Sequence, residues 1–148
     1  MGFSEVARRL STRHVPYTER KKQAIWAGST TGVPCYDIGP CASSCNELER
    51  VKLVRYFNNI TWLNLRLSNA VQWCHGSAAA LKDEGLLGDH VQEDEWAQYR
   101  GVLDIDGNVD AWGLRWRLES GSVVFLVKSS YEHFFSNSLV DGTHYVHM

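Results

Sequence analysis

The sequence predicts one α/β domain in which helices flank a parallel β-sheet. The clearest indication is the stretch of residues 101–128, where two short apolar segments rich in β-forming residues enclose a turn and a helical pattern. So short a crossover joins neighbouring parallel strands through a right-handed connection. The chain has 148 residues, 44% of them hydrophobic, which is enough for one globular core. Strand and helix patterns also alternate before and after this stretch, as in layered α/β domains.

The N-terminal segment differs from the rest of the chain in composition. Residues 1–20 are polar and include four arginines, so we interpret them as a frayed helix or a lead-in. We therefore assign the domain to residues 21–148.

Local patterns predict the elements of this domain in order. Residues 47–58 are typical of a helix, because Leu48, Val51, Val54 (or Leu53) and Phe57 share one face. The full set is a strand at 23–26, loops at 28–46, a helix at 47–58, a strand at 70–74, a polar loop at 75–89 with a short helix near 78–81, a short helix at 93–99, a strand at 101–105, a helix from Asp110 that ends at 120–122, a strand at 123–127, a helix at 131–138 and a last strand at 144–146.

Charge and hydropathy exclude several classes of protein. The net charge of −2 gives no basic stripe for nucleic acid, so we expect no nucleic-acid partner. No apolar run approaches the roughly 20 residues of a membrane span. Residues 1–13 are charged and lack the apolar core of a signal peptide. The lone histidines are not spaced as metal ligands, and we expect no metal site.

Four cysteines and one glycosylation triplet bear on the cellular compartment. Cys35, Cys41, Cys45 and Cys74 have no zinc-finger spacing. We expect free thiols, with a disulfide within Cys35–Cys45 in a secretory compartment as the alternative. The triplet at residues 59–61 (Asn-Ile-Thr) is an acceptor pattern for N-glycosylation that also arises by chance.

Two loops predict a binding site for an anion. Ligands of parallel sheets lie beyond the carboxyl ends of the strands, where the Asp106-Gly107-Asn108 turn and the following helix start are expected. Upstream, residues 28–32 (Gly-Ser-Thr-Thr-Gly) supply hydroxyls and N–H groups suited to a phosphate or sugar, although an ordinary turn has the same composition. This loop lacks the lysine of a Walker motif. No G-x-G-x-x-G follows a strand, which argues against a dehydrogenase or methyltransferase.

The same motifs carry a family resemblance. Residues 104–108 (DIDGN), a helix with Trp112, residues 120–135 (SGSVVFLVKSSYEHFF) and residues 144–146 (HYV) resemble the C-terminal signature of glycosyltransferase family 90. This family contains Rumi-like protein O-glucosyltransferases and fungal capsule xylosyltransferases. Residues 25–32 (IWAGSTTG) resemble its upstream W-R-G-S-T-T-G motif. The match runs from about Lys21 to Val146.

The resemblance implies a Rossmann-like domain that is the nucleotide-sugar-binding half of a GT-B glycosyltransferase. It implies a UDP-sugar donor, bound without a metal or other cofactor, and transfer of glucose or xylose to a hydroxyl of a protein or glycan acceptor. Eukaryotic members imply the lumen of the endoplasmic reticulum or Golgi. It also implies that Arg50 faces the donor diphosphate and that Glu132 contacts the ribose, although a surface glutamate at the start of a helix is an equal alternative for Glu132. The candidate donor-binding residues are Ser29, Thr30, Thr31, Arg50, Gly107, Asn108, Arg117, Ser122 and Glu132.

The sequence departs from the family pattern at two arginine positions. Ala27 and Gly113 stand where the resemblance implies arginine. On a helix, Arg117 lies one turn beyond Gly113 and leans back toward it, whereas Arg115 points to the outer surface. We therefore expect Arg117 to supply the missing cation. The alternative is that both arginines are solvated and that a Trp112–Trp116 stripe alone packs inward.

No catalytic residue is assigned in this chain. The family's general base lies in an N-terminal acceptor-binding half, which these residues do not match. We therefore expect no transfer by this chain alone. The alternative function is a non-catalytic or degenerate nucleotide-sugar-binding module that acts with a partner or a missing domain.

Overall fold

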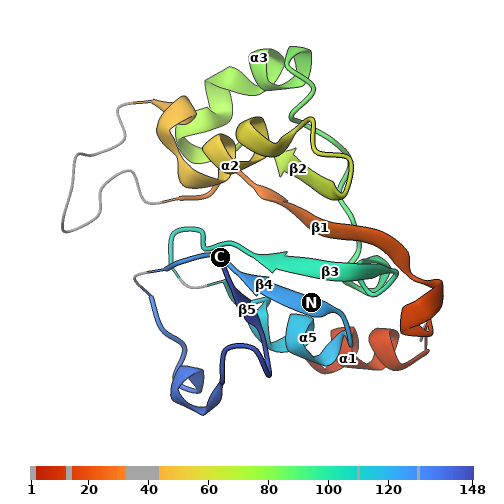
Figure 1. Ribbon diagram of the computed structural model, residues 1–148. Coiled ribbons are helices and arrows are strands. Elements are labelled where there is room, and N and C mark those ends of the chain that lie inside the picture. The colour runs from red at the N-terminus through yellow and green to blue at the C-terminus, as the bar shows by residue number, and fades with distance from the viewer. Residues whose placement is uncertain (1–2, 13–14, 33–43, 110, 130) are drawn as a thin grey trace.

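The computed structural model describes residues 3–12, 15–32, 44–109, 111–129 and 131–148. Its strands form one five-stranded sheet in the order β2-β1-β3-β4-β5, and every neighbouring pair is parallel. This arrangement confirms the predicted Rossmann-like parallel sheet flanked by helices (Figure 1). The strands are β1 (Lys21–Ser29), β2 (Leu63–Asn69), β3 (Tyr99–Asp104), β4 (Val123–Leu126) and β5 (Val146–His147).

Helices lie on both sides of this sheet. The α-helix α2 packs on β2, while α1, α4 and α5 pack together beside β3 and β4 (Figure 1). None of the described helices is long and apolar enough to cross a membrane. The α-helices are α1 (Phe3–Thr12), α2 (Glu49–Phe57), α3 (Ala78–Asp83), α4 (Glu93–Trp96) and α5 (Leu114–Glu119). Short 3-10 helices occupy Tyr17–Glu19, Cys45–Glu47, Gln72–Ser77 and Ser136–Ser138.

The N-terminal segment contributes to the core. Val6 and Leu10, one turn apart on α1, are buried in the contact of α1 with α4 and α5. Beneath them, Trp96 and Trp116 meet edge to face with ring centroids 5.2 Å apart. The expected frayed lead-in is therefore a packed helix over residues 3–12, because its two apolar side chains fall on one face. The proposed domain limit at residue 21 stays a prediction.

The strand predicted at residues 70–74 is wrong. The strand of this region is β2, and Gln72–Ser77 forms a 3-10 helix instead. Leu63, Leu65 and Leu67 are buried, and polar residues alternate with them along the strand. This alternation is the pattern of a strand with one buried face, and the longer apolar character of the following residues concealed it.

The helix predicted at residues 131–138 is also wrong. Within its described part only Ser136–Ser138 is helical, as a single 3-10 turn. The Ser129 hydroxyl accepts a hydrogen bond from the backbone N–H of Tyr131, and the Ser136 hydroxyl accepts one from the N–H of His133. Serine side chains that occupy backbone donors in this way compete with helix formation. Phe134 is consequently 97% exposed instead of lying on a packed helix face.

Helix boundaries near the central turn differ by a few residues. The helix predicted at 93–99 ends at Trp96, and Tyr99 already begins β3. The helix predicted from Asp110 begins at Leu114, and Asp110 itself lies outside the described residues. The predicted strands at 101–105 and 123–127 correspond to β3 and β4.

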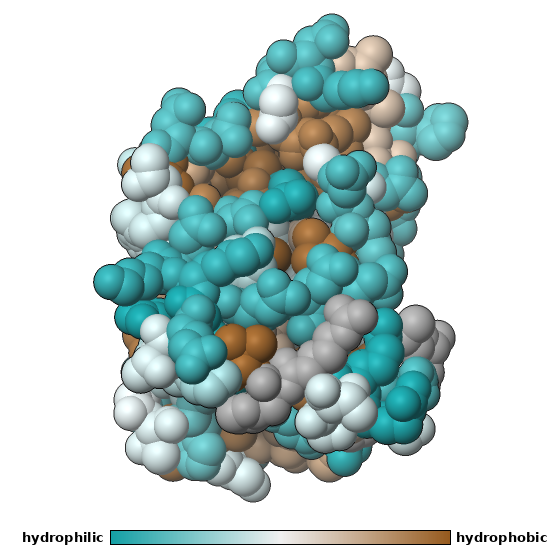
Figure 2. All heavy atoms as spheres, turned by 90° about the vertical axis from the view of Figure 1, so that its right-hand side faces the viewer, coloured by the Kyte–Doolittle hydropathy of each residue, from teal (hydrophilic) through white to brown (hydrophobic). Residues whose placement is uncertain are grey.

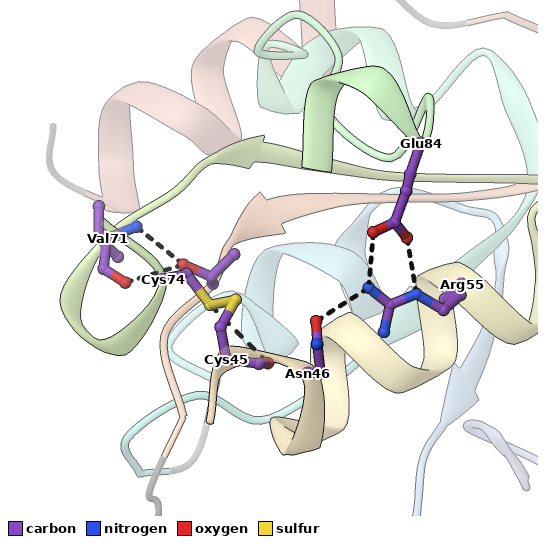
Figure 3. The surroundings of a disulfide bond; sticks show 7 residues. Cys45, Asn46, Arg55, Val71, Cys74 and Glu84 are labelled. Atoms are coloured by element: carbon purple, nitrogen blue, oxygen red, sulfur yellow. Dashed lines mark hydrogen bonds and ion pairs between the residues drawn. A yellow bond between two sulfur atoms is a disulfide. The ribbon is translucent and has the colours of Figure 1, made fainter. Parts of the chain in front are cut away.

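A disulfide joins two parts of the chain that flank α2 and β2. Cys45 and Cys74, 29 residues apart, are bonded at an S–S distance of 2.05 Å (Figure 3). The expectation of free thiols is therefore wrong for Cys45 and Cys74. The alternative, a bridge within residues 35–45, is also wrong for Cys45, because its partner is distant in sequence and close only in the fold. Cys35 and Cys41 lie outside the described residues.

Polar contacts reinforce the region of the disulfide. The Arg55 guanidinium on α2 donates to Glu84 Oε2 at 2.8 Å and to Asn46 Oδ1 at 3.1 Å (Figure 3). Asn46 adjoins Cys45, and Glu84 follows α3. The disulfide and this ion pair thus hold α2 to the segments on either side of it.

Loss of the disulfide should lower the free energy of unfolding. Closing a loop of 29 residues restricts the unfolded chain, so we expect the Cys45→Ala/Cys74→Ala variant to lose about 3–4 kcal/mol. Denaturant unfolding of the parent and the variant, with and without a reductant, measures this loss. The change in unfolding free energy that the reductant causes in the double variant is the background, and it is subtracted from the change measured in the parent. Equal stability of the two oxidised proteins would contradict a stabilising role for the bridge.

Candidate functional site

A cleft of about 700 Å³ opens at the carboxyl edge of the sheet. Its wall combines the end of β1, the turn after β3 and the start of α5. Its size falls within the range of small-molecule sites, and its position is the usual one for ligands of open parallel sheets. The lining residues are Trp26, Ala27, Gly28, Ser29, Thr31, Arg50, Ser68, Asn69, His90, Val91, Glu93, Trp96, Gly107, Asn108, Val109, Ala111, Trp112, Gly113, Trp116 and Arg117.

Arg50 of α2 binds the ends of two strands at the floor of this cleft. Its Nε donates to the backbone carbonyl of Asp106 at 2.6 Å, and its Nη2 donates to that of Ile105 at 2.7 Å. Its Nη1 donates to the Ser29 carbonyl at 3.1 Å and to Thr31 Oγ1 at 2.6 Å. The planar guanidinium therefore joins the loop after β1 to the turn after β3.

Arg50 remains a cation in this setting. Its pKa is lowered to about 10, mainly by burial and then by the positive charge of Arg117, against the opposing effect of Asp104 and Asp106. Its guanidinium also lies 5.2 Å from the ring centroid of Trp26. Backbone carbonyls solvate the ion without neutralising it, so Arg50 brings a fixed positive charge to the cleft at neutral pH.

Arg117 of α5 is the second cation of the cleft, and it is buried. Its Nη1 pairs with Asp104 Oδ1 at the end of β3. The guanidinium lies against two indole rings, 4.9 Å from the Trp96 centroid and 4.8 Å from the Trp116 centroid. Burial lowers the pKa of Arg117 and raises that of Asp104, while the ion pair opposes both shifts. The Nε of Arg117 and the Nε1 of Trp116 are buried without a hydrogen-bond partner among the described residues.

Gly113 provides the space that this guanidinium occupies. A Cβ atom at Gly113 would lie 2.5 Å from Arg117 Nη1 and 2.9 Å from Trp116 Nε1. The predicted location of the Arg117 side chain, which reaches back toward Gly113, is therefore confirmed. Its role toward a donor stays a prediction. Arg115 points outward as expected, with a side chain 62% exposed. Because Arg117 is buried, the alternative of two solvated arginines is wrong.

The structure brings several predicted donor-binding residues together. Ser29, Thr31, Gly107 and Asn108 line the cleft beside Arg50 and Arg117. Asn108 Oδ1 accepts a hydrogen bond from the N–H of Gly32 at 3.1 Å and so connects the two predicted loops. Their roles toward a donor stay predictions.

Three predicted residues lie outside the cleft lining. The Thr30 hydroxyl is buried and exchanges hydrogen bonds with the backbone N–H and carbonyl of Val71. Ser122 lies at the opposite edge of the sheet, where the strands begin, and donates to the Tyr99 carbonyl at 2.7 Å. Glu132 is exposed in the segment after β4. The described structure thus gives Thr30 and Ser122 structural hydrogen bonds.

The sequence analysis did not predict that tryptophans line the cleft. Trp26, Trp96 and Trp116 are nearly buried, whereas Trp112 is 63% exposed. The Trp112–Trp116 stripe of the alternative interpretation is therefore divided, with Trp116 inside and Trp112 at the surface. Four of the six tryptophans line the cleft, and this convergence could not be read from the sequence because it depends on the packing of α4 against α5.

Metal-ligating side chains do not converge within the part of the chain that the structure describes. No group of three or more His, Cys, Asp or Glu residues there could hold a metal ion. Whether ligand binding needs a metal stays a prediction.

Comparison with known proteins shows that this chain is similar to glycosyltransferases. The model of glycosyl transferase family 90 matches residues 3–148. Protein O-glucosyltransferase 2 of Danio rerio is 34% identical over 103 residues, which are 68% of this chain and 19% of that protein. The chain therefore spans about a fifth of the length of that relative.

A side chain at position 113 should disturb the Arg117 site. In Gly113→Ala, the new methyl group competes with a guanidinium held by Asp104 and two tryptophans, so we expect a loss of about 1–3 kcal/mol in the free energy of unfolding. Gly76→Ala is the matched control, because nothing lies within 4 Å of a Cβ atom there. Chemical denaturation measures both. Equal stabilities of the two variants would contradict this account of Gly113.

Removal of Arg117 should destabilise the fold in a pH-dependent way. Arg117→Met leaves the Asp104 carboxylate buried without its cation, at a cost of about 3–5 kcal/mol at neutral pH. A carboxyl group whose pKa is raised on folding contributes stability below its unfolded pKa of about 3.9, and loses that contribution as the pH rises through the folded value. The defect should therefore shrink as the pH falls toward about 4.

The double variant Asp104→Asn/Arg117→Met provides the control for this pH dependence. It removes the titrating group, so its stability relative to the parent should recover at neutral pH. A defect in Arg117→Met that is the same at neutral and acid pH would contradict the assignment to Asp104.

Proposed function

Since the chain belongs to glycosyl transferase family 90, we propose that its cleft binds the nucleotide-sugar donor of a glycosyltransferase. The observation that carries this proposal is the pair of arginines at the carboxyl edge of the sheet, of which Arg50 is partly buried and Arg117 is buried. Arg50 and Arg117 line one cleft together with hydroxyl groups of Ser29 and Thr31. Cations and hydroxyls at this edge suit a diphosphate joined to a sugar.

Arg50 is suited to stabilise a leaving diphosphate. Its four hydrogen bonds to fixed acceptors position the charge before any ligand arrives. A preorganised cation of this kind favours the negative charge that develops on the nucleotide as the glycosidic bond breaks. Arg117 adds two groups, Nε and Nη2, that donate to no other described residue. We assign the diphosphate to the space between these two guanidinium groups.

The exposed ring of Trp112 is the proposed contact for a flat or ring-shaped part of the donor. It lies on the cleft wall with 63% of its surface exposed. An indole at a cleft rim offers apolar area to a nucleobase or a sugar face. The acceptor hydroxyl also needs a general base, which we assign to no residue of this chain.

The same proposal extends to the kind of donor and to the cellular compartment of the protein. We propose a UDP-sugar with glucose or xylose, held in a GT-B arrangement with an acceptor-binding part that supplies the base. The relative named protein O-glucosyltransferase 2 supports transfer to a protein hydroxyl. The Cys45–Cys74 disulfide supports an oxidising compartment, such as the lumen of the endoplasmic reticulum or Golgi.

A non-catalytic module that binds the same donor is the second candidate. Asp104 pairs with Arg117 and so reduces the positive charge that this arginine brings to the cleft. Ala27, on the cleft wall, adds no charge where the resemblance implies arginine. Both observations favour a weaker hold on an anionic donor than two free arginines would provide.

We expect the chain to bind UDP in the presence of EDTA. Arg117→Lys keeps the positive charge beside Asp104 and removes the planar fork, so UDP binding should weaken by about 1.5–3 kcal/mol. Arg115→Lys changes an exposed arginine on the outer face of the same helix and should leave the affinity unchanged. Isothermal titration calorimetry with near-UV circular dichroism as a test of folding measures both.

Two outcomes would contradict this proposal. Binding that appears only after magnesium or manganese is restored would overturn the metal-free donor site. A larger loss of affinity in Arg115→Lys than in Arg117→Lys would show that the ligand meets a different face of α5.

A further inference from the structure

The turn between α2 and β2 presents an acceptor triplet on the surface. Residues 59–61 (Asn-Ile-Thr) are the only N-x-Ser/Thr triplet in the 148-residue sequence. Asn59 and Thr61 are exposed, and the side chain of Asn59 makes no hydrogen bond to other described residues. We propose that Asn59 is a site of N-linked glycosylation.

The turn is anchored through the residue between the two acceptor positions. Ile60 is partly buried against the core, and its backbone N–H donates to the Phe57 carbonyl at 3.0 Å. The Thr61 carbonyl accepts from Gln23 Nε2 at 2.7 Å, which ties the turn to β1. These contacts use backbone groups and one apolar side chain. The Asn59 amide and the Thr61 hydroxyl are left without such a role, so modification of Asn59 removes no contact of the fold.

The disulfide is the independent observation that places the chain where this reaction occurs. A buried Cys45–Cys74 bridge persists in oxidising compartments of the secretory pathway, which are also those in which N-glycans are attached. In the reaction, the Asn59 amide nitrogen forms a bond to the anomeric carbon of a lipid-diphosphate-linked oligosaccharide. The bond from that carbon to the diphosphate breaks, the lipid diphosphate leaves, and one amide proton is released.

The position of the turn separates the glycan from the cleft. Asn59 precedes β2, at the edge of the sheet where the strands begin, whereas the cleft lies where they end (Figure 1). Figure 2 views the molecule from the side on which the strands begin and shows a largely hydrophilic surface interrupted by apolar patches. A glycan on Asn59 therefore extends into solvent at this edge and leaves the cleft open.

An apolar groove beside the turn is a surface that the glycan would shield. Trp62, which follows the triplet, is 56% exposed. It lines a shallow groove of about 250 Å³ together with Ala24, Val123 and Phe125. A bulky hydrophilic glycan next to an exposed apolar surface shields it from association with other chains.

Expression of the full chain behind a cleavable secretory leader in eukaryotic cells tests this inference. We expect one glycosylated form that peptide N-glycosidase converts to the unmodified mass, with Asn59 converted to Asp in the peptide map. Asn59→Gln and Thr61→Ala should each abolish the shift, whereas Thr61→Ser should retain it. Asn58→Gln, a change of the adjacent exposed asparagine, is the matched control and should also retain it.

Two results would overturn the proposal. One is a chain that reaches the lumen with the Cys45–Cys74 bridge formed and carries no glycan. The other is a change in UDP affinity on enzymatic removal of the glycan, which would contradict its position away from the cleft. Because occupancy is measured by mass, the site is tested even if the chain binds no UDP, and failure of the donor proposal stays distinguishable.

Discussion

The hydrogen bonds of Arg50 fix the geometry of the candidate site. One guanidinium receives its acceptors from the loop after β1 and the turn after β3, so the floor of the cleft exists only while α2 holds this side chain in place. The start of α2 is in turn held by Cys45, four residues before Glu49, through its disulfide to Cys74. Only a 3-10 turn, Leu48 and Glu49 separate the bridged Cys45 from Arg50, so the disulfide lies close in sequence to the side chain that joins the two loops of the cleft.

Opposite charges lie near one another at this edge of the sheet, which limits the free energy lost by burying them. Arg50 and Arg117 share the region with Asp104 and Asp106, and the two buried ions, Arg117 and Asp104, form a pair. Burial alone would favour the neutral forms of Asp104 and Arg117, and removal of either charge leaves its partner with that penalty. The site is therefore polar and nearly balanced. In the proposed donor site, an anionic ligand would therefore gain its affinity from hydrogen bonds that the arginines still have free, more than from a surplus of positive charge.

The unit β3–turn–α5–β4 was predictable because its signals are local. Apolar segments, turn residues and helix periodicity are contiguous there, and helix geometry alone was enough to direct Arg117 toward Gly113. Other features depend on contacts between distant residues. The partner of Cys45 lies 29 residues away, and no spacing rule selects it. The segment at 131–138 carries helix-compatible apolar spacing, yet serine hydroxyls take its backbone donors. The same limit applies to Arg50, whose four acceptors come from residues that meet only after the sheet has formed.

The contact between Gly113 and Arg117 couples two positions of the sequence. An arginine at 113, which the resemblance implies, would place its guanidinium at the start of α5. Here Arg117 extends back over that start, and the space it fills is the space that any side chain at 113 would take. The guanidinium lies against Trp96 and Trp116 and pairs with Asp104, so its location is set by these contacts as much as by its own backbone. Glycine at 113 is then a requirement of arginine at 117. The two positions are therefore coupled, because the absence of a side chain at 113 leaves the space in which the Arg117 guanidinium lies.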